Sequence, residues 1–146
     1  MVPVQFKIGF DELDREKLRL LWGNILETQQ WSEGPYTEKF EEKWIEHVGK
    51  NSISFSSWGG AALSALEYFN VRGGIVLCPS NTFMATPLSV IKVGGTVEYV
   101  DCNKDDLCMS YDDLREKIEI FNPIAIWVVH IGGHVAFEIE LIAQLC

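Results

Sequence analysis

Apolar side chains recur at helical spacing near the start of the chain. Four of them, spaced i, i+3, i+4 and i+7, predict an amphipathic helix over residues 12–28: Leu18, Leu21, Trp22 and Ile25. A turn over residues 32–35 follows, and four more recur at every fourth position: Tyr36, Phe40, Trp44 and Val48. These predict a second helix that Gly49 is placed to end. We expect the aromatic stripe of these helices to pack on a larger domain or on a partner subunit.

From residue 52 onward, short β-branched and apolar runs alternate with helical patterns. The runs predict strands over residues 52–57, 75–78, 96–100 and 124–129. The helical patterns cover residues 62–69, 83–93, 110–120 and 139–146, and Ser110 with Asp113 resembles a capping box. Alternation at this spacing predicts an α/β fold, with a mainly parallel sheet and helices on both of its faces. The run 124–129 is apolar throughout, which is typical of a strand buried on both faces.

The pattern divides the chain into an N-terminal helical segment, residues 1–51, and a partial α/β domain, residues 52–146. The last helical pattern reaches Cys146 without a glycine cap, a basic last turn or a following strand. We therefore expect the sequence to be truncated at its C-terminus, as part of a larger α/β domain.

Charge and cysteine usage limit the class of protein. With 21 acidic and 12 basic residues the net charge is -9, which argues against nucleic acid or anionic membrane as a partner. The longest apolar run, 124–129, is far shorter than the roughly 20 residues of a membrane helix, and the first ten residues hold no signal-peptide core. The cysteines show no CxxC spacing, so we expect reduced thiols in the cytoplasm and no zinc site: Cys78, Cys102, Cys108 and Cys146.

Two segments fall where an α/β sheet binds ligands. Gly59 and Gly60 follow a predicted strand and open a helix, which is either a phosphate site or a tight turn without a ligand. Residues 79–86 follow the strand 75–78, at the carboxyl edge of the sheet. Phe83 in this segment could present its ring to a planar ligand, although an aromatic residue at a helix start is more often part of the core.

Histidines and acidic residues near the C-terminus are the other candidates. His130 ends the last predicted strand and is expected to face the same site as a substrate-binding residue. His134 lies four residues later, but the two glycines between them disfavour a helix, so we expect no metal site. Glu138 and Glu140 are expected on a solvated helix face, not as a catalytic pair.

Five segments in one order carry a family resemblance. They are residues 31–41 (WSEGPYTEKFE), 59–63 (GGAAL), 79–86 (PSNTFMAT), 94–101 (GGTVEYVD) and 129–130 (VH). From about residue 12 to its end, the chain resembles the DegT/DnrJ/EryC1/StrS family of pyridoxal-phosphate-dependent aminotransferases of nucleotide-sugar metabolism. The resemblance implies part of the large domain of a type I aminotransferase, active as a cytoplasmic homodimer.

The resemblance also implies a cofactor and a reaction. Members of the family use pyridoxal 5'-phosphate to move an amino group, usually from glutamate, to a keto sugar linked to a nucleotide, in amino-sugar and polysaccharide biosynthesis. The family's glycine–threonine turn, which binds the cofactor phosphate, matches Gly59, Gly60 and Ala61. Its aromatic residue that stacks on the pyridine ring matches Phe83.

The chain departs from the family pattern in two places. Gly60 replaces the threonine, so a hydroxyl is lost while the backbone donors can remain. The family's aspartate at the pyridine nitrogen and its Schiff-base lysine come later than Cys146, and no lysine from Lys7 to Lys117 is at that position. We therefore expect no catalytic residue here and no transamination by this chain alone.

Three other interpretations stay open. A sugar dehydratase of the same superfamily has a histidine in place of the lysine. A non-catalytic module could pair with a complete homologue, and an α/β domain without a cofactor is the least informative possibility.

Overall fold

The structure is a computed structural model that describes residues 9–146. The first eight residues lie outside this range, although they belong to the predicted segment 1–51 and to the stretch expected to hold no signal peptide. The chain divides into two compact units between Ser54 and Phe55. Among the described residues, no helix combines the length and apolar character needed to cross a bilayer.

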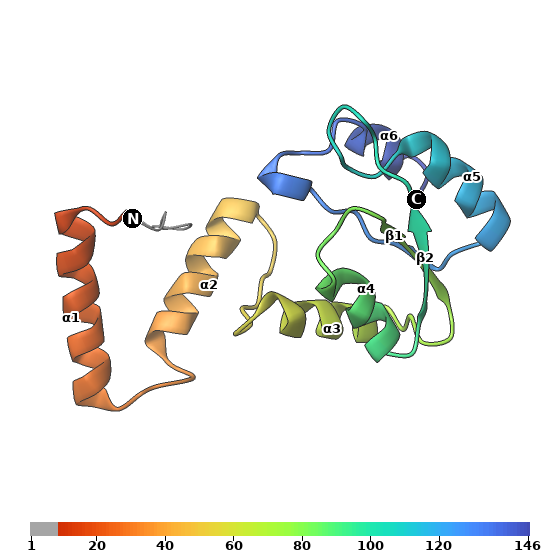
Figure 1. The fold of residues 1–146 in the computed structure, drawn as a ribbon. Helices are drawn as coiled ribbons and strands as arrows, with labels where there is room; N and C mark the ends of the chain where they lie inside the picture. The colour runs from red at the N-terminus through yellow and green to blue at the C-terminus, as the bar shows by residue number, and fades with distance from the viewer. Residues whose placement is uncertain (1–8) are drawn as a thin grey trace, which may run out of the picture. The chain divides into compact units, whose positions relative to one another are not determined.

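Two helices form the first unit, as the pattern predicts. Helix α1 spans Glu12–Thr28 and α2 spans Pro35–Val48 (Figure 1). The Asp11 carboxylate accepts the N–H of Asp14 at 2.8 Å, which caps the start of α1. Gly49 ends α2 with a φ of 67°, a left-handed conformation that glycine adopts without steric cost. Neither helix contains a buried residue, and Trp22, Phe40 and Trp44 of their apolar stripes are exposed.

A three-stranded parallel sheet organises the second unit. Its strands are β1 (Ile75–Pro79), β2 (Thr96–Val100) and β3 (Ala125–Ile126), in the order β2-β1-β3. The helices are α3 (Trp58–Tyr68), α4 (Ala85–Lys92), α5 (Tyr111–Phe121) and α6 (Ile139–Ala143), with a short 3₁₀ turn, η1, at Ile131–Gly133. The predicted parallel α/β architecture is confirmed.

Residues 52–57 form no strand, so that prediction is wrong. A strand needs a neighbour to satisfy its backbone, and this segment pairs with no strand of residues 9–146. Glu41 of α2 instead accepts hydrogen bonds from the backbone N–H and the hydroxyl of Ser54, each at 2.7 Å. These two bonds hold the pKa of Glu41 below its ordinary value.

The strand predicted at 124–129 shrinks to Ala125–Ile126, and its residues are only half-buried. Strand β3 pairs with β1 alone, because it lies at the edge of the sheet. The apolar run suggested burial on both faces, but a strand at the edge of the sheet has less cover than a central one. Full burial belongs to the central strand β1.

Helices cover both faces of the sheet, as predicted: α3 and α4 lie on one face, and α5 and α6 lie on the other (Figure 1). An apolar core lies between β1 and each pair of helices. Val76 and Cys78 pack with α3 and α4, whereas Leu77 packs with α5 and α6. Alternate residues of a strand point to opposite faces, so one five-residue strand anchors both layers. Burial raises the pKa of the Cys78 thiol to about 11, and all four cysteines are free.

Helix α5 begins with half of the predicted capping box. The Ser110 hydroxyl accepts the N–H of Asp113 at 3.5 Å. The Asp113 carboxylate does not return the bond to Ser110; it accepts the N–H of Asp101 at 2.6 Å and pairs with Lys117 at 3.0 Å. Asp113 therefore ties the start of α5 to the end of β2.

Asp113→Asn is expected to lose stability relative to wild type at neutral pH and not in strong acid. Burial raises the pKa of Asp113, but the bonds from Asp101 and Lys117 outweigh it and leave the pKa below its usual value. A carboxylate whose pKa is lowered by folding stabilises the fold at pH values above its unfolded pKa of about 3.9. This stabilisation is lost as the pH falls through the folded pKa. The difference in unfolding free energy, from urea titrations between pH 7 and pH 2, should therefore shrink below about pH 4. Equal shrinkage in Asp112→Asn, which removes the same charge one residue earlier, would assign the effect to net charge instead.

Candidate functional site

A cleft of about 610 Å³ opens at the carboxyl edge of the sheet, within the second unit. Three segments line it: the start of α3, the segment from Thr82 to Thr86 after β1, and residues 127–132 after β3. Parallel strands β1 and β3 both end at this edge, so the chain segments that leave them converge there. This is the position where open α/β sheets bind ligands.

The N-terminus of α3 supplies backbone donors to the cleft. Ser57 caps the helix: its hydroxyl accepts the N–H of Gly60 at 3.2 Å, and its carbonyl accepts that of Ala61 at 3.3 Å. The N–H groups of Trp58 and Gly59 precede the first intrahelical bond and are free to bind an anion. A Cβ added to Gly59 would meet nothing nearer than the Ser57 hydroxyl, at 3.9 Å, so the backbone there is open to close approach.

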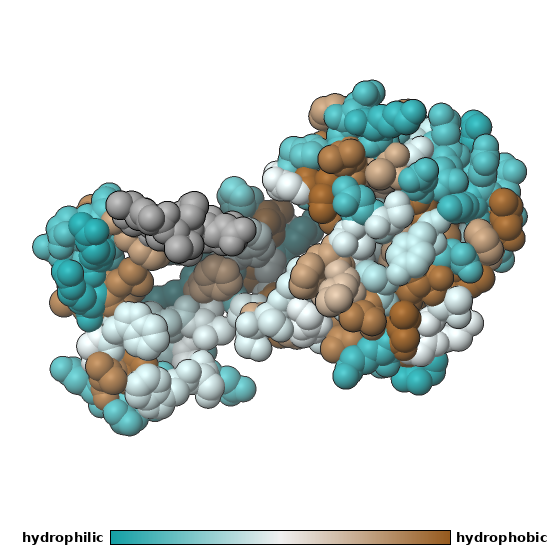
Figure 2. All heavy atoms as spheres, viewed as in Figure 1, coloured by the Kyte–Doolittle hydropathy of each residue, from teal (hydrophilic) through white to brown (hydrophobic). Residues whose placement is uncertain are grey.

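Aromatic rings form a second part of the lining. Phe83 lines the cleft and keeps 73% of its surface exposed. Exposure of so much apolar surface to water is unfavourable unless a ligand or another segment covers the side chain. Trp58 and Trp127 pack together across the cleft lining, with ring centroids 5.6 Å apart. The space-filling view shows other hydrophobic side chains at the surface as well (Figure 2).

His130 contributes one polar group with a defined orientation. Its Nδ1 accepts the N–H of Ala136 at 3.1 Å. A neutral imidazole that accepts at Nδ1 carries its proton on Nε2, so His130 retains one N–H donor. Thr82 and Thr86 add hydroxyl groups that lie 3.0 Å apart.

Three of the five expected site residues line the cleft, and the other two do not. Gly59, Phe83 and His130 line the cleft. Gly60 and Ala61 are not part of its lining, and their N–H groups bind Ser57. Sequence reasoning did not single out Ser57, Trp58 or Trp127 as site residues; the only signal for Ser57 was its position before the helix.

Glu138 corrects another expectation. It is half-buried rather than solvated, and its carboxylate accepts hydrogen bonds from the Asn103 amide at 2.7 Å and the Tyr111 N–H at 2.9 Å. Glu138 therefore holds the chain before α6 against the loop that precedes α5. It has a structural role, and the expectation of no catalytic pair with Glu140 is untouched.

The donor set of the cleft fits a phosphorylated planar ligand. A phosphate suits the free N–H groups of α3, a flat ring suits the exposed face of Phe83, and a polar substituent suits His130 Nε2–H. Among residues 9–146 the lining holds no lysine.

Comparison with known sequences identifies the family of the chain. The sequence profile of the DegT/DnrJ/EryC1/StrS aminotransferase family matches residues 13–146. The chain belongs to this family. It is 30% identical over 135 residues to the 3-oxo-glucose-6-phosphate:glutamate aminotransferase of Bacillus subtilis, covering 91% of this chain and 30% of that protein. It is 32% identical over 116 residues to the GDP-perosamine synthase of Escherichia coli O157:H7, covering 78% of this chain and 31% of that protein. The chain thus spans about a third of the length of these relatives.

Solved structures share the fold of this chain. The crystal structure of NtdA from Bacillus subtilis with bound cofactor PMP aligns with a TM-score of 0.81 at 28% identity, over 93% of this chain and 32% of that chain. The sugar aminotransferase CalS13 from Micromonospora echinospora aligns with a TM-score of 0.77 at 24% identity, over 98% of this chain and 38% of that chain. The predicted fold class, part of the large domain of a pyridoxal-phosphate-dependent aminotransferase, is confirmed.

Proposed function

We propose that this chain is the N-terminal part of a pyridoxal-phosphate-dependent aminotransferase that acts on a nucleotide-linked keto sugar in amino-sugar biosynthesis. The observation that carries the proposal is the cleft in which Gly59, Phe83 and His130 meet, in a chain of this aminotransferase family. Residues 1–51 would form an N-terminal helical segment, and residues 52–146 would form part of the cofactor-binding domain.

The α3 N-terminus would hold the phosphate of the cofactor. The donors are the N–H groups of Trp58 and Gly59, and the positive end of the helix dipole favours the anion. Gly60 lacks the family's threonine hydroxyl, but Ser57 lines the cleft and its hydroxyl keeps a proton to donate while it accepts from Gly60. Ser57 would thus supply the missing hydroxyl from a neighbouring position. Gly60 and Ala61 would stabilise the turn through the hydrogen bonds of their N–H groups to Ser57.

The remaining lining residues would orient the ring and the sugar. Phe83 would stack on the pyridine ring, and His130 Nε2–H would donate to the sugar substrate. Pyridoxal phosphate, when bound, supplies an electron sink for the carbon that exchanges the amino group. Since the lining holds no lysine among residues 9–146, these residues would bind the cofactor without a covalent bond, and this chain alone would not transaminate.

The names of relatives support a sugar substrate but differ in its activating group. One names a sugar 6-phosphate with glutamate as the donor, and another names a GDP-linked sugar. A third, 28% identical, is a dTDP-4-amino-4,6-dideoxy-D-glucose transaminase from Escherichia coli. We propose a nucleotide-linked keto sugar, with glutamate as the amino donor.

The protein would assemble as a homodimer in the cytoplasm. Phe40 and Trp44 of α2 stack at 6.2 Å between ring centroids, and each stays about half exposed. Trp22 of α1 is similarly exposed. Such a stripe suits burial against a second subunit, and free cysteines suit a reducing compartment.

Binding of pyridoxamine phosphate tests the cofactor site without interference from surface lysines, because this amine forms no Schiff base with them. Quenching of tryptophan fluorescence, with Trp58 and Trp127 in the lining, reports the titration. We expect pyridoxamine phosphate to bind at least about 10-fold more tightly than pyridoxamine, since charge-assisted hydrogen bonds to an ion contribute about 1.5–3 kcal/mol. Inorganic phosphate should compete. Equal affinities for the two amines would contradict a phosphate site at α3.

A further inference from the structure

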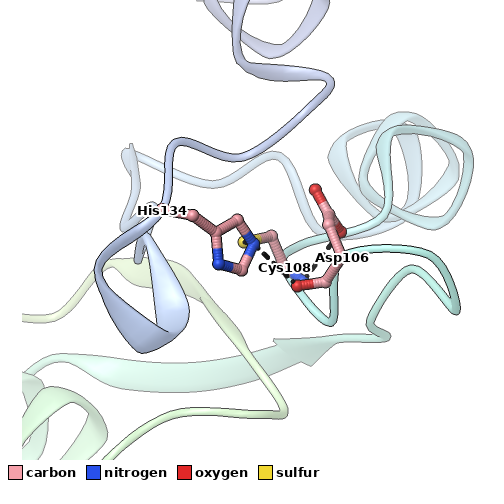
Figure 3. A group of neighbouring side chains, drawn as sticks. All are labelled: Asp106, Cys108 and His134. Carbon is pink, nitrogen blue, oxygen red and sulfur yellow. Dashed lines mark hydrogen bonds between the residues drawn. The ribbon is translucent and has the colours of Figure 1, made fainter.

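A second group of side chains lies outside the cleft lining. Asp106 and Cys108 belong to the loop between β2 and α5, and His134 follows η1 (Figure 3). One ligand atom from each residue lies within 4.8 Å of the others. We infer that Asp106, Cys108 and His134 form a binding site for one zinc-like divalent cation, which fastens the loop after η1 to the loop before α5.

The distance between the two softer ligands matches zinc. Cys108 Sγ lies 3.6 Å from His134 Nε2. Zinc bonds of about 2.3 Å to sulfur and about 2.0–2.1 Å to nitrogen, at a tetrahedral angle, place these atoms about 3.5 Å apart. A cation can therefore enter with little movement of either side chain. Sulfur and nitrogen ligands favour zinc over magnesium or calcium, which prefer oxygen alone.

The third ligand is buried and held in place. Asp106 is 4% exposed, and its carboxylate accepts the N–H of Cys108 at 2.9 Å and that of Phe137 at 2.7 Å. Each carboxylate oxygen has a further lone pair, so it can bind a metal while it accepts these bonds. Hydrogen bonds of this kind, from the surrounding backbone to a ligand, hold the ligands of metal sites in their orientation. Cys108 is 1% exposed, whereas His134 is exposed and opens the site to solvent.

Metal binding requires two changes in the placement of protons. His134 Nε2 also lies 3.0 Å from the carbonyl oxygen of Asp106, to which an Nε2–H would donate. For a cation to bind, the imidazole proton must sit on Nδ1, and the Cys108 thiol must release its proton to solvent. A dication with one thiolate and one carboxylate gives a neutral site, so the buried charges cancel. One released proton makes the affinity rise with pH.

The loop after η1 connects the proposed metal site to the cleft. His130 and Gly132 line the cleft, and His134 follows two residues later on the same segment. A cation bound at His134 would therefore fix one wall of the cleft. The expectation of no metal site weighed the spacing of the cysteines and that of His130 and His134, and it did not pair His134 with the distant loop that holds Asp106 and Cys108.

Cobalt titration of the whole 146-residue chain, freed of metal with a chelator, tests the inference. We expect one equivalent of Co²⁺ to give a thiolate-to-metal charge-transfer band that Zn²⁺ displaces. Zn²⁺ should also raise the unfolding temperature. Cys108→Ser should abolish the band, and His134→Gln should weaken binding at least about 10-fold. Because His134 is exposed, the second variant keeps the fold even where the first fails to fold.

Cys102→Ser and Cys146→Ser serve as matched controls, since each removes a thiol outside the cluster. Both should keep the band and the stoichiometry. The inference is overturned if wild type shows no band, if the band survives Cys108→Ser, or if His134→Gln binds Co²⁺ as tightly as wild type. Any of these results would leave the three residues as a hydrogen-bonded contact between loops.

Discussion

Leu77→Ala is expected to lower the free energy of unfolding by about 2–5 kcal/mol, the range for truncating a fully buried leucine. Leu77 lies in the central strand β1 and has no exposed surface. It belongs to one buried apolar cluster with Val100 of β2, Leu114 of α5 and Ile142 of α6. The neighbours come from three elements tied to one sheet, so they cannot close together over the lost volume, and a cavity remains.

The consequence for the folded population is large. Domains of this size are stable by about 5–15 kcal/mol, so the loss is a large fraction of the total. Urea unfolding followed by circular dichroism measures it as a lower midpoint with an unchanged slope. Leu88→Ala on α4 is the control, because 53% of that side chain is exposed, and it should cost less than about 1 kcal/mol. A cost for Leu77→Ala as small as that of the control would refute the two-layer packing around β1.

Helices and the central sheet were predictable from sequence because local periodicity decides them. Strand β2 occupies the predicted range 96–100, and α1 the predicted range 12–28. The two strand predictions that were wrong have the same cause, which a local sequence pattern does not encode. Residues 52–57 and 124–129 have β-forming composition, but whether they form a ladder depends on which segments lie beside them.

The candidate site was predictable only in part, for the same reason. Gly59, Phe83 and His130 each follow a strand or open a helix, and the rule that ligands bind at the carboxyl edge of a parallel sheet is enough to gather them. Asp106 and His134 are 28 residues apart in sequence, and nothing in either segment marks them as neighbours. Their contact arises from the long-range packing of two loops, which the structure alone reveals.

Gly59→Asp is expected to weaken pyridoxamine phosphate binding at least about 100-fold, which corresponds to about 2.7 kcal/mol. The new carboxylate would stand in the first turn of α3, beside the backbone donors proposed for the phosphate. Like charges about 4 Å apart repel by about 4 kcal/mol at an effective dielectric constant of 20. The same carboxylate interacts favourably with the positive end of the helix dipole, so the fold should be as stable as wild type or more so. Loss of binding with an unchanged unfolding temperature separates the site from the fold.

The matched control places the same charge farther along the same helix, at the exposed position Ser64. Ser64→Asp should bind pyridoxamine phosphate as wild type does, because screening and distance from the cleft weaken the repulsion. Pyridoxamine, which has no phosphate, should bind both variants about equally. If Gly59→Asp instead weakened pyridoxamine and its phosphate by the same factor, the substitution would act on the ring or on cleft shape. The N-terminus of α3 would then not be the phosphate site.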